Sequence, residues 1–490
     1  MRRAAALLLL ALLPARPQTP PPSTEDLEEA VRRFTAALAA AMENAADPVD
    51  LDTAFYRGAI PGMLRRLDPH SVFFDAEQFE QLKELERSVT RGFGTVVSLL
   101  PGRVIILQTM PGSPSQKAGL APGDEILVIN NIPLAYLDLD QLVELLGYTR
   151  QREAHLLVRR QGEPRPVEVT LSPAELDSPS VDRSFLLEPG IAYIRVSSFD
   201  VKTPEALREA IQKLGGEELK GLVLDLRNNQ GGVVQAAVAA AALFLEAGSV
   251  IFSARGRNTP VEELKVPVGF TPYRFRLAVL VNGKTASAAE IFAGAIQDND
   301  RGALIGEPTF GKGLVQRVYP LSSGTGLALT TAFYYTPSGR SIQKPLRGTE
   351  LDRATAESEQ EFRTRLGRPV RGGGGIQPDF IVYQQAYSPL GRVLEASGAY
   401  PNFATEWLKN RSGGVSGDFE ITAEILDEFQ LWLSRRNIRP TLAEWTAERE
   451  TVRRRLKQEI LNQAVGVAAG DEVELRADPV VLRALSLFGA

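Results

Sequence analysis

A serine that could act as a nucleophile lies in the segment RLAVLVNGKTASAAEIF. The apolar run Leu277 to Val281 predicts a buried strand, which turns at Asn282-Gly283 and brings Ser287 into the first turn of the next helix. At a helix N-terminus, free backbone N–H groups and the positive end of the dipole favour a developing oxyanion. A simpler and commoner role is also open, because Thr285 or Ser287 could serve only as the N-cap of the helix.

A lysine between two glycines, Lys312, lies in the segment GALIGEPTFGKGLVQ. The spacing Gly306-x4-Gly311-Lys312 resembles a phosphate-binding loop, but residue 313 is glycine where that loop needs a Ser or Thr for magnesium. The following residues, LVQRVYPL, predict a strand, whereas a phosphate-binding loop must open a helix. We therefore reject nucleotide binding. The glycines would let the ammonium be drawn into a pocket, and the alternative is a solvated loop lysine.

Two adjacent glycines, Gly231 and Gly232, end the strand-like segment LVLDLRNNQGG and precede an Ala-rich helical segment. Parallel sheets gather the carboxyl ends of their strands at one edge, where active sites collect. If this loop neighbours the Ser287 loop, its N–H groups could complete an oxyanion pocket. The alternative is that the glycines serve only the sharp turn.

The elements around these segments predict a largely parallel sheet. Strands alternate with helices of 11 to 13 residues from GIAYIRVSSF to ALIG, a pattern typical of right-handed βαβ units. Two further strands are expected at Leu314 to Tyr319 and Leu327 to Tyr335.

The flanking regions differ in character. Short β-branched runs with Gly and Pro turns fill residues 91–172 around one helix, Leu139 to Leu146, and indicate a compact β domain. Residues 23–45 open with the capping signal SxxD and predict an amphipathic helix, whose apolar stripe could be core or a dimer contact. The last hundred residues carry no chemical motif and are expected to form a helical appendage.

Composition narrows the chemistry. The 490 residues carry 55 Lys and Arg against 60 Asp and Glu, so the net charge of −5 offers no basic field for nucleic acid. The chain has no cysteine, which removes thiol nucleophiles, thiolate zinc sites and iron–sulfur clusters. Only His70 and His155 could serve a histidine mechanism. We expect catalysis by other groups, without metal or cofactor.

The first residues, MRRAAALLLLALLPARP, combine two arginines with an apolar run that is too short for a membrane-spanning helix. We interpret residues 1–17 as a signal peptide, cleaved near Ala15, and expect an exported mature protein, periplasmic or secreted, without a membrane span. The alternative is an apolar N-terminus of a cytosolic protein.

Several motifs together resemble one family, the C-terminal processing peptidases, or tail-specific proteases, over roughly residues 54 to 385. They are LDPHS, RGFGTVV, PGSPSQKAGLAPGDEILVINN, LVLDLRNNQGG, NGKTASAAEIFAGAIQD, GEPTFGKGLVQ, TTAFYYTPSGRSIQ and GGGGIQPD. The resemblance implies an α/β multidomain protein, with a crotonase-like βαβ protease core and an inserted PDZ β domain between helical extensions. The implied boundaries are 18–90 for the N-terminal helical region, 91–172 for the PDZ domain, 173–385 for the Ser/Lys protease core and 386–490 for the C-terminal helical region.

The resemblance also implies roles for single residues. The nucleophile falls on Ser287, the general base on Lys312, and the residue that orients the lysine on Gln316. Oxyanion donors fall on the Ala288 amide and one of Gly231 or Gly232. Three positions depart from the family pattern without touching the Ser/Lys pair: Thr285, Ala289 and Gln230.

A lysine base must be neutral, whereas free lysine has a pKa of about 10.4. Burial without a counter-ion would lower that pKa, and no acidic residue lies between Gly311 and Pro320. Gln316 could hold the lysine without restoring its charge. Residues four apart in a straight strand are about 13 Å apart, so a bend at Gly313 is expected. We expect His70 to be structural.

In the PDZ-like region, the loop Gly92, Phe93, Gly94 would offer N–H groups to a terminal carboxylate. A bound peptide would pair with the strand that begins at Thr95 and Val96. Four helix residues are expected to line an apolar groove, with core packing as the alternative: Leu139, Leu142, Val143 and Leu146.

We therefore predict an exported serine endopeptidase that recognises proteins or peptides by apolar C-termini and cleaves through an acyl-enzyme. A homodimer through the N- or C-terminal helices is possible. The alternative function is a non-catalytic PDZ scaffold that retains the protease fold.

Overall fold

The computed structural model describes residues 23–86, 89–160, 163–257, 259–349, 351, 361–384, 386–409 and 414–489. The predicted signal peptide lies outside these residues. The chain divides into two compact units, one up to Met63 and one from Leu64 onward. No described helix combines the length and apolarity needed to cross a bilayer.

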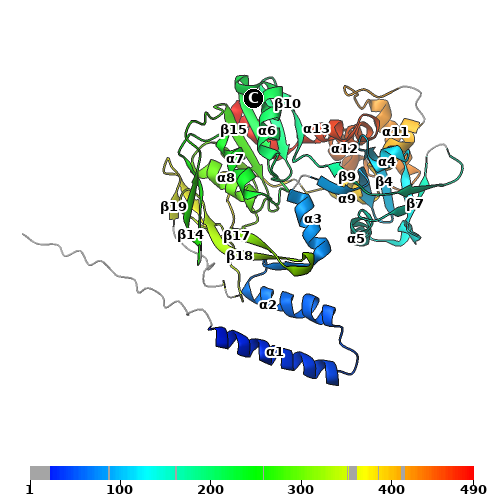
Figure 1. Ribbon diagram of the computed structural model, residues 1–490. Coiled ribbons are helices and arrows are strands. Elements are labelled where there is room, and N and C mark those ends of the chain that lie inside the picture. The colour runs from blue at the N-terminus through cyan, green and yellow to red at the C-terminus, as the bar shows by residue number, and fades with distance from the viewer. Residues whose placement is uncertain are drawn as a thin grey trace, which may run out of the picture. The chain divides into compact units, whose positions relative to one another are not determined.

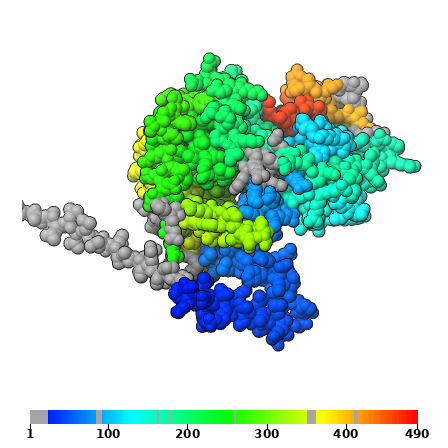
Figure 2. Space-filling view, viewed as in Figure 1, coloured from blue at the N-terminus to red at the C-terminus, as the bar shows by residue number. Residues whose placement is uncertain are grey.

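The first unit contains the predicted amphipathic helix, α1, Thr24–Asn44. Ser23 Oγ accepts the Asp26 N–H at 3.1 Å, as the capping signal predicted. None of the residues of α1 is buried, and Leu27, Val31, Phe34 and Met42 are 44–60% exposed. Among the described residues, the apolar stripe of this helix, which is dark blue in Figure 2, is therefore largely exposed, although Phe34 packs edge-on against Phe55. A π-helical turn, Thr53–Ala59, follows, and α2, Ile60–Leu67, leads into the second unit.

A six-stranded sheet, ordered β10-β11-β12-β15-β16-β21, forms the centre of the second unit. Only the β10–β11 pair is antiparallel, so the parallel sheet expected from the strand–helix alternation is present. The strands are β10 Val181–Glu188, β11 Ile191–Val196, β12 Gly221–Asp225, β15 Arg276–Val281, β16 Ala303–Gly306 and β21 Phe380–Ile381. The loops that carry the candidate residues leave β12, β15 and β16 at their carboxyl ends.

Helices cover both faces of this sheet. The helices α6 Thr203–Leu214, α7 Val234–Ala242 and α8 Ala288–Asp298 pack on one face (Figure 1). Side chains along β12 alternate: Leu222 and Leu224 join the core beneath these helices, whereas Val223 points to the opposite face. There it meets Val481 and Leu485 of α14, Pro479–Phe488.

The packing of α14 on the second face of the sheet corrects the expectation for the C-terminal region. The C-terminal residues were expected to be an appendage, yet α14 completes the core because a parallel sheet must be buried on both faces. Four other C-terminal helices share an aromatic core that includes Phe429 and Trp445: α9 Pro389–Ala396, α10 Ala399–Lys409, α11 Ala423–Ser434 and α12 Leu442–Ala464. The remaining helix, α13 Val467–Leu475, adds Leu475 to the core beneath α14.

A second sheet carries the lysine segment. The hairpin β17 Leu314–Pro320 and β18 Gly326–Tyr335 confirms both predicted strands. β18 also pairs with β1 Val72–Phe74 and with β13 Val250–Gly256, which pairs in turn with β14 Thr259–Lys265. Next to β1 lies α3, Ala76–Glu86. A short hairpin, β19 Glu361–Arg363 and β20 Pro369–Arg371, follows.

The predicted β domain is an antiparallel sheet ordered β3-β4-β5-β7-β8. Its strands are β3 Thr95–Leu100, β4 Arg103–Thr109, β5 Glu125–Ile129, β6 Ile132–Pro133, β7 Ala154–Arg159 and β8 Val167–Leu171. Its helices are α4 Pro114–Lys117 and α5 Leu139–Thr149, with a 3-10 turn at Leu134–Tyr136. The strand β2, Val89–Gly92, enters the domain and pairs with β9, Ala174–Asp177, which leaves it.

Candidate active site

Ser287 is the residue that precedes α8, and its backbone is sharply turned. Its φ of 56° and ψ of −120° lie in a region that non-glycine residues rarely adopt. Such strained positions cluster at functional sites. Ser287 is half-buried and lies between buried neighbours, Thr285 and Ala286 before it and Ala288 and Ala289 after it. The Ser287 N–H donates to Glu290 Oε2 at 2.9 Å.

The three predicted oxyanion donors lie around Ser287 but differ in their bonding. A Cβ atom on Gly231 would lie 2.9 Å from the Ser287 Cβ, so glycine is needed for this close approach. The Gly231 N–H already donates to Asn229 Oδ1 at 2.8 Å. Among the described residues, the N–H groups of Gly232 and Ala288 have no acceptor, which leaves both able to bind an added oxygen.

The loops after β12 and β15 are bonded directly to each other. Asn228 and Asn282 exchange two hydrogen bonds of 3.0 Å, and the Ala286 N–H donates to the Asn229 carbonyl at 2.9 Å. Thr285, where the family pattern has serine, donates its hydroxyl to the Leu226 carbonyl at 2.8 Å. The departure at position 285 therefore preserves a hydroxyl contact between the two loops.

A buried glutamate that sequence reasoning did not single out, Glu290, joins the serine and lysine segments. It is fully buried in α8 and accepts from Thr309 Oγ1 at 2.5 Å and from the Gly311 N–H at 2.7 Å. Its Oε2 accepts from the N–H groups of both Ser287 and Lys312, each at 2.9 Å. Burial raises the pKa of Glu290, and these donors oppose the shift. The two candidate catalytic residues thus meet, through their backbones, at one carboxylate oxygen. The only sign of Glu290 in the sequence is the final E of the motif TASAAE.

Lys312 reaches Gln316 as the resemblance implied. Lys312 Nζ donates to Gln316 Oε1 at 2.5 Å. The pair can meet because Lys312 precedes β17, which begins at Leu314, and because the pairing with β18 shifts register between Val315 and Gln316. At the expected bend, the Gly313 N–H donates to the buried Gln343 side chain at 2.8 Å.

The surroundings of Lys312 make its neutral form easier to reach than that of a solvated lysine. Burial lowers the pKa of the ammonium below its usual value, and the Asp68 and Glu290 carboxylates only partly oppose this. The proximity of Asp68 was not anticipated, because it lies more than two hundred residues away in the sequence, in the LDPHS motif.

The LDPHS motif forms a tight turn beside this pair. Asp68 accepts from the N–H groups of His70 and Ser71 at 2.8 and 2.9 Å, and from Ser71 Oγ at 2.7 Å. The His70 carbonyl accepts a short hydrogen bond from Gln316 Nε2. His70 therefore contributes its backbone to the orientation of Gln316. Within the described ranges, no group of three or more His, Asp or Glu side chains could hold a metal ion.

The PDZ-like region contains a largely apolar cavity of about 600 Å³. The predicted carboxylate loop, Gly92 to Gly94, and the first strand residues, Thr95 and Val96, line this cavity. Leu146, Arg91 and Arg150 also line it. Among the described residues, the Phe93 and Gly94 N–H groups have no acceptor. The sequence analysis did not predict Arg91 and Arg150 as part of this pocket, although cationic side chains bind carboxylates well.

The four helix residues predicted to line the groove do not behave alike. Leu142 is fully buried in the core of the β domain, because it sits on the face of α5 that covers the sheet, so it does not line the groove. Leu139 and Val143 are 45% and 54% exposed, and Leu146 lines the cavity. The core alternative therefore holds for Leu142.

Comparisons with known proteins identify the family. The model of peptidase family S41 matches residues 190–355, and that of the PDZ domain matches residues 105–160. A carboxy-terminal-processing protease of Bartonella bacilliformis is 35% identical over 297 residues, 60% of this chain and 68% of the relative. A carboxyl-terminal-processing protease of Synechocystis sp. is 35% identical over 292 residues, 58% of this chain and 68% of the relative.

A solved structure, a photosystem II D1 C-terminal processing protease, is 26% identical with a TM-score of 0.39, covering 71% of this chain and 86% of that chain. The two curated relatives and the two family models confirm the predicted resemblance. The chain belongs to the carboxy-terminal processing proteases of peptidase family S41, with a PDZ domain.

Proposed function

We propose that this chain is a serine endopeptidase that uses a Ser287/Lys312 dyad. The observation that carries the proposal is the setting of Lys312: its ammonium has a lowered pKa, it bonds to an uncharged amide, and its backbone shares a carboxylate oxygen with Ser287. A lysine becomes an effective base near neutral pH only when its surroundings make the neutral form accessible.

In the proposed reaction, neutral Lys312 Nζ takes the proton of Ser287 Oγ while this oxygen attacks the scissile carbonyl carbon. The carbonyl oxygen becomes an oxyanion bound by backbone amides. When the C–N bond breaks, the Lys312 ammonium gives its proton to the leaving amine, and an acyl ester remains on Ser287. A water that loses a proton to Lys312 then attacks the ester, and the same proton goes to Ser287 Oγ as the C–O bond breaks; the product leaves as a carboxylic acid, which ionises in solvent.

We assign the oxyanion donors to Ala288 and, of the two glycines, to Gly232. The free N–H groups of both residues support the assignment. Gly231 would serve only if Asn229 released its N–H. Its proposed contribution is instead the lack of a side chain beside Ser287.

We further propose that the PDZ domain, with the boundaries 91–172, binds the apolar C-terminus of a substrate beside the protease core, 173–385. The Phe93 and Gly94 amides and the two arginines would bind the carboxylate, and Leu146 would contact the terminal side chain.

Export and a homodimer complete the proposal. The apolar run after two arginines supports cleavage of a signal peptide near Ala15.

The exposed stripe of α1 supports pairing with a second copy, because contiguous exposed apolar surface marks interaction sites. Light scattering on the mature chain should give a dimer, and Val31→Glu with Phe34→Glu should give a monomer. A monomeric wild-type protein would exclude pairing through α1.

The test of the dyad is active-site labelling. Incubation of the mature protein with a fluorophosphonate, followed by peptide mapping, should place the adduct on Ser287, and Ser287→Ala should abolish both labelling and casein cleavage. The melting temperature should change little, because a partly exposed hydroxyl makes few packing contacts. If the wild-type chain binds C-terminal peptides but is neither labelled nor proteolytic, it is the non-catalytic PDZ scaffold.

A further inference from the structure

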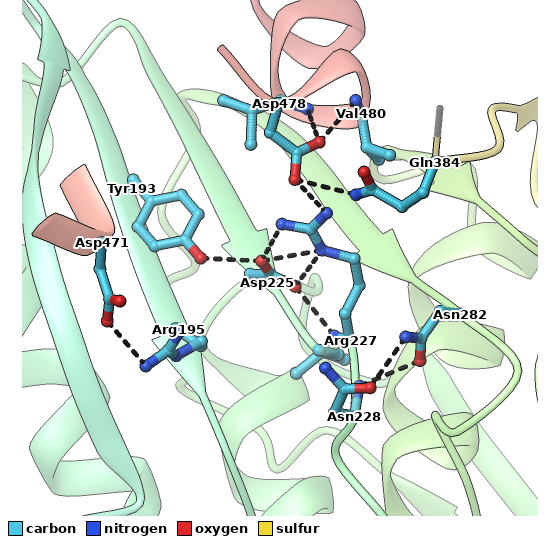
Figure 3. A network of polar contacts seen from close by, with 12 residues as sticks. Tyr193, Arg195, Asp225, Arg227, Asn228, Asn282, Gln384, Asp471, Asp478 and Val480 are labelled. Atoms are coloured by element: carbon cyan, nitrogen blue, oxygen red, sulfur yellow. Dashed lines mark hydrogen bonds and ion pairs between the residues drawn. The ribbon is translucent and has the colours of Figure 1, made fainter. Parts of the chain in front are cut away.

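The N-terminus of α14 meets the active-site loop at Arg227. Arg227 Nη1 lies 2.6 Å from Asp478 Oδ2, and its Nη2 lies 2.7 Å from Asp225 Oδ2 (Figure 3). Arg227 Nε also donates to both carboxylate oxygens of Asp225 at 3.0 Å. One guanidinium therefore bridges the end of β12 and the N-cap residue of the C-terminal helix α14.

Ionic contacts, and not tight packing, set the position of this arginine. The side chains of Arg227, Asp225 and Asp478 are only 12%, 2% and 8% exposed. A cavity of about 250 Å³ nevertheless lies beside them, so the guanidinium has space into which it could move. If the Asp478 carboxylate were lost, Asp225 would still compensate the Arg227 charge, but Arg227 Nη1 would lose its acceptor. The guanidinium should therefore shift about its bonds to Asp225, toward the adjacent cavity.

Arg227 is followed directly by the loop that surrounds Ser287. Asn228 has a φ of 63° and bonds to Asn282, and the Asn229 carbonyl accepts from Ala286. Three residues further on, Gly231 and Gly232 pass beside Ser287. A shift of Arg227 would thus be transmitted to the amides that face the serine.

We propose that Asp478 is a positioning residue, which holds Arg227 and so fixes the Gly231–Gly232 segment relative to Ser287. The inference rests on the proposed function. It assigns a part in the active site to a helix far beyond residue 355, where the match to the peptidase family model ends.

The two oxygens of Asp478 have separate tasks, which makes a clean test possible. Its Oδ1 caps α14 by accepting from the Val480 and Val481 N–H groups at 2.7 and 3.3 Å. Its Oδ2 binds Arg227 and Gln384. Asn and Ser are good N-cap residues, so Asp478→Asn and Asp478→Ser should keep the helix while removing the charge. Asp471→Asn is the matched control, because Asp471 lines the same cavity but pairs with Arg183 and Arg195.

The experiment measures KM and the kcat per labelled Ser287 site for the wild type and each variant. It also compares the affinity of a peptide aldehyde with that of the corresponding peptide amide. Loss of one oxyanion donor lowers kcat by about 10²–10³-fold, so a displaced donor should lower it by about tenfold or more in both Asp478 variants. Aldehyde affinity should fall in parallel, whereas KM, amide affinity and the Asp471→Asn control should stay at wild-type values.

A merely structural role would lower the melting temperature but leave kcat per labelled site unchanged, and that result would overturn the inference. Arg227→Lys supplies a second route if α14 unfolds in both variants. Its shorter side chain keeps a charge beside Asp225 but cannot reach Asp478, so it should reproduce the loss of kcat, and wild-type kcat would refute the proposal. Failure of the proposed function is distinct, because the wild-type protein would then not be labelled at Ser287.

Discussion

The pKa of Lys312 gives the mechanism its sharpest quantitative test. Burial lowers that pKa from an ordinary value of 10.5, so the unfolded chain binds more protons than the folded chain between the two pKa values. The free energy of unfolding must therefore rise with pH across this window. Below the folded pKa the penalty is complete and constant, and above 10.5 it vanishes. Each unit of depression corresponds to about 1.4 kcal/mol.

The variant that isolates this effect is Lys312→Met, which keeps an apolar stem but cannot titrate. The assay is urea unfolding of wild type and variant at several pH values from 6 to 11, a range of about five units that spans the usual lysine pKa. The difference in unfolding free energy, wild type minus Lys312→Met, should increase with pH. A loss of the Gln316 hydrogen bond shifts this difference by a constant and does not change its slope.

Activity should follow the same titration. The turnover of wild type should rise with pH through an apparent pKa below 10.5, as the neutral amine forms. Lys312→Arg should lose activity by about 10²–10⁴-fold, the usual contribution of a general base, because guanidinium keeps its proton. A pH-independent stability difference, or substantial turnover by Lys312→Arg, would refute the reasoning.

Two further predictions concern Glu290 and the PDZ domain. Glu290→Gln should destabilise the fold by about 1–3 kcal/mol for each buried donor left without an acceptor. It should also lower kcat, because four donors share this carboxylate. Thermal unfolding with wild-type stability would contradict the role of Glu290. C-terminal amidation of an apolar peptide should weaken its binding to the full chain carrying Ser287→Ala by about 1.5–3 kcal/mol, the value of hydrogen bonds to a charged group. Calorimetry measures the change, and equal affinities would exclude recognition of the carboxylate by the Phe93 and Gly94 amides.

Sequence patterns predicted the elements that carry the chemistry because those elements have strong local signals. The alternation of strands and helices predicted the parallel sheet, and the 12-residue helix α6 has the length that this pattern indicated. The Lys312–Gln316 contact came from the resemblance. Its geometry could not be predicted, because spacing along a regular strand would have kept the two side chains apart.

The contacts that sequence reasoning missed are those that join distant segments. Asp68, Glu290 and Asp478 each act on a residue of another element, and nothing in their own neighbourhoods distinguishes a carboxylate with such a partner from a solvated one or a helix cap. Leu142 shows the same limit for an apolar side chain, since helical spacing alone cannot separate groove from core.

The positions of these carboxylates also explain how burial can lower the pKa of Lys312 in a charged neighbourhood. Glu290 has its oxygens occupied by backbone and hydroxyl donors, and Asp68 is occupied by the turn at His70 and Ser71. A carboxylate whose lone pairs are engaged by neutral donors has less to offer an ammonium, so burial outweighs it and the pKa of Lys312 stays low. Asp225 and Asp478 are engaged instead by Arg227, whose charge cannot be lost. The site thus contains two cations in different settings: Arg227, which is paired with two carboxylates, and Lys312, whose pKa burial lowers. This difference is what the proposed roles of a loop-positioning arginine and a lysine base require.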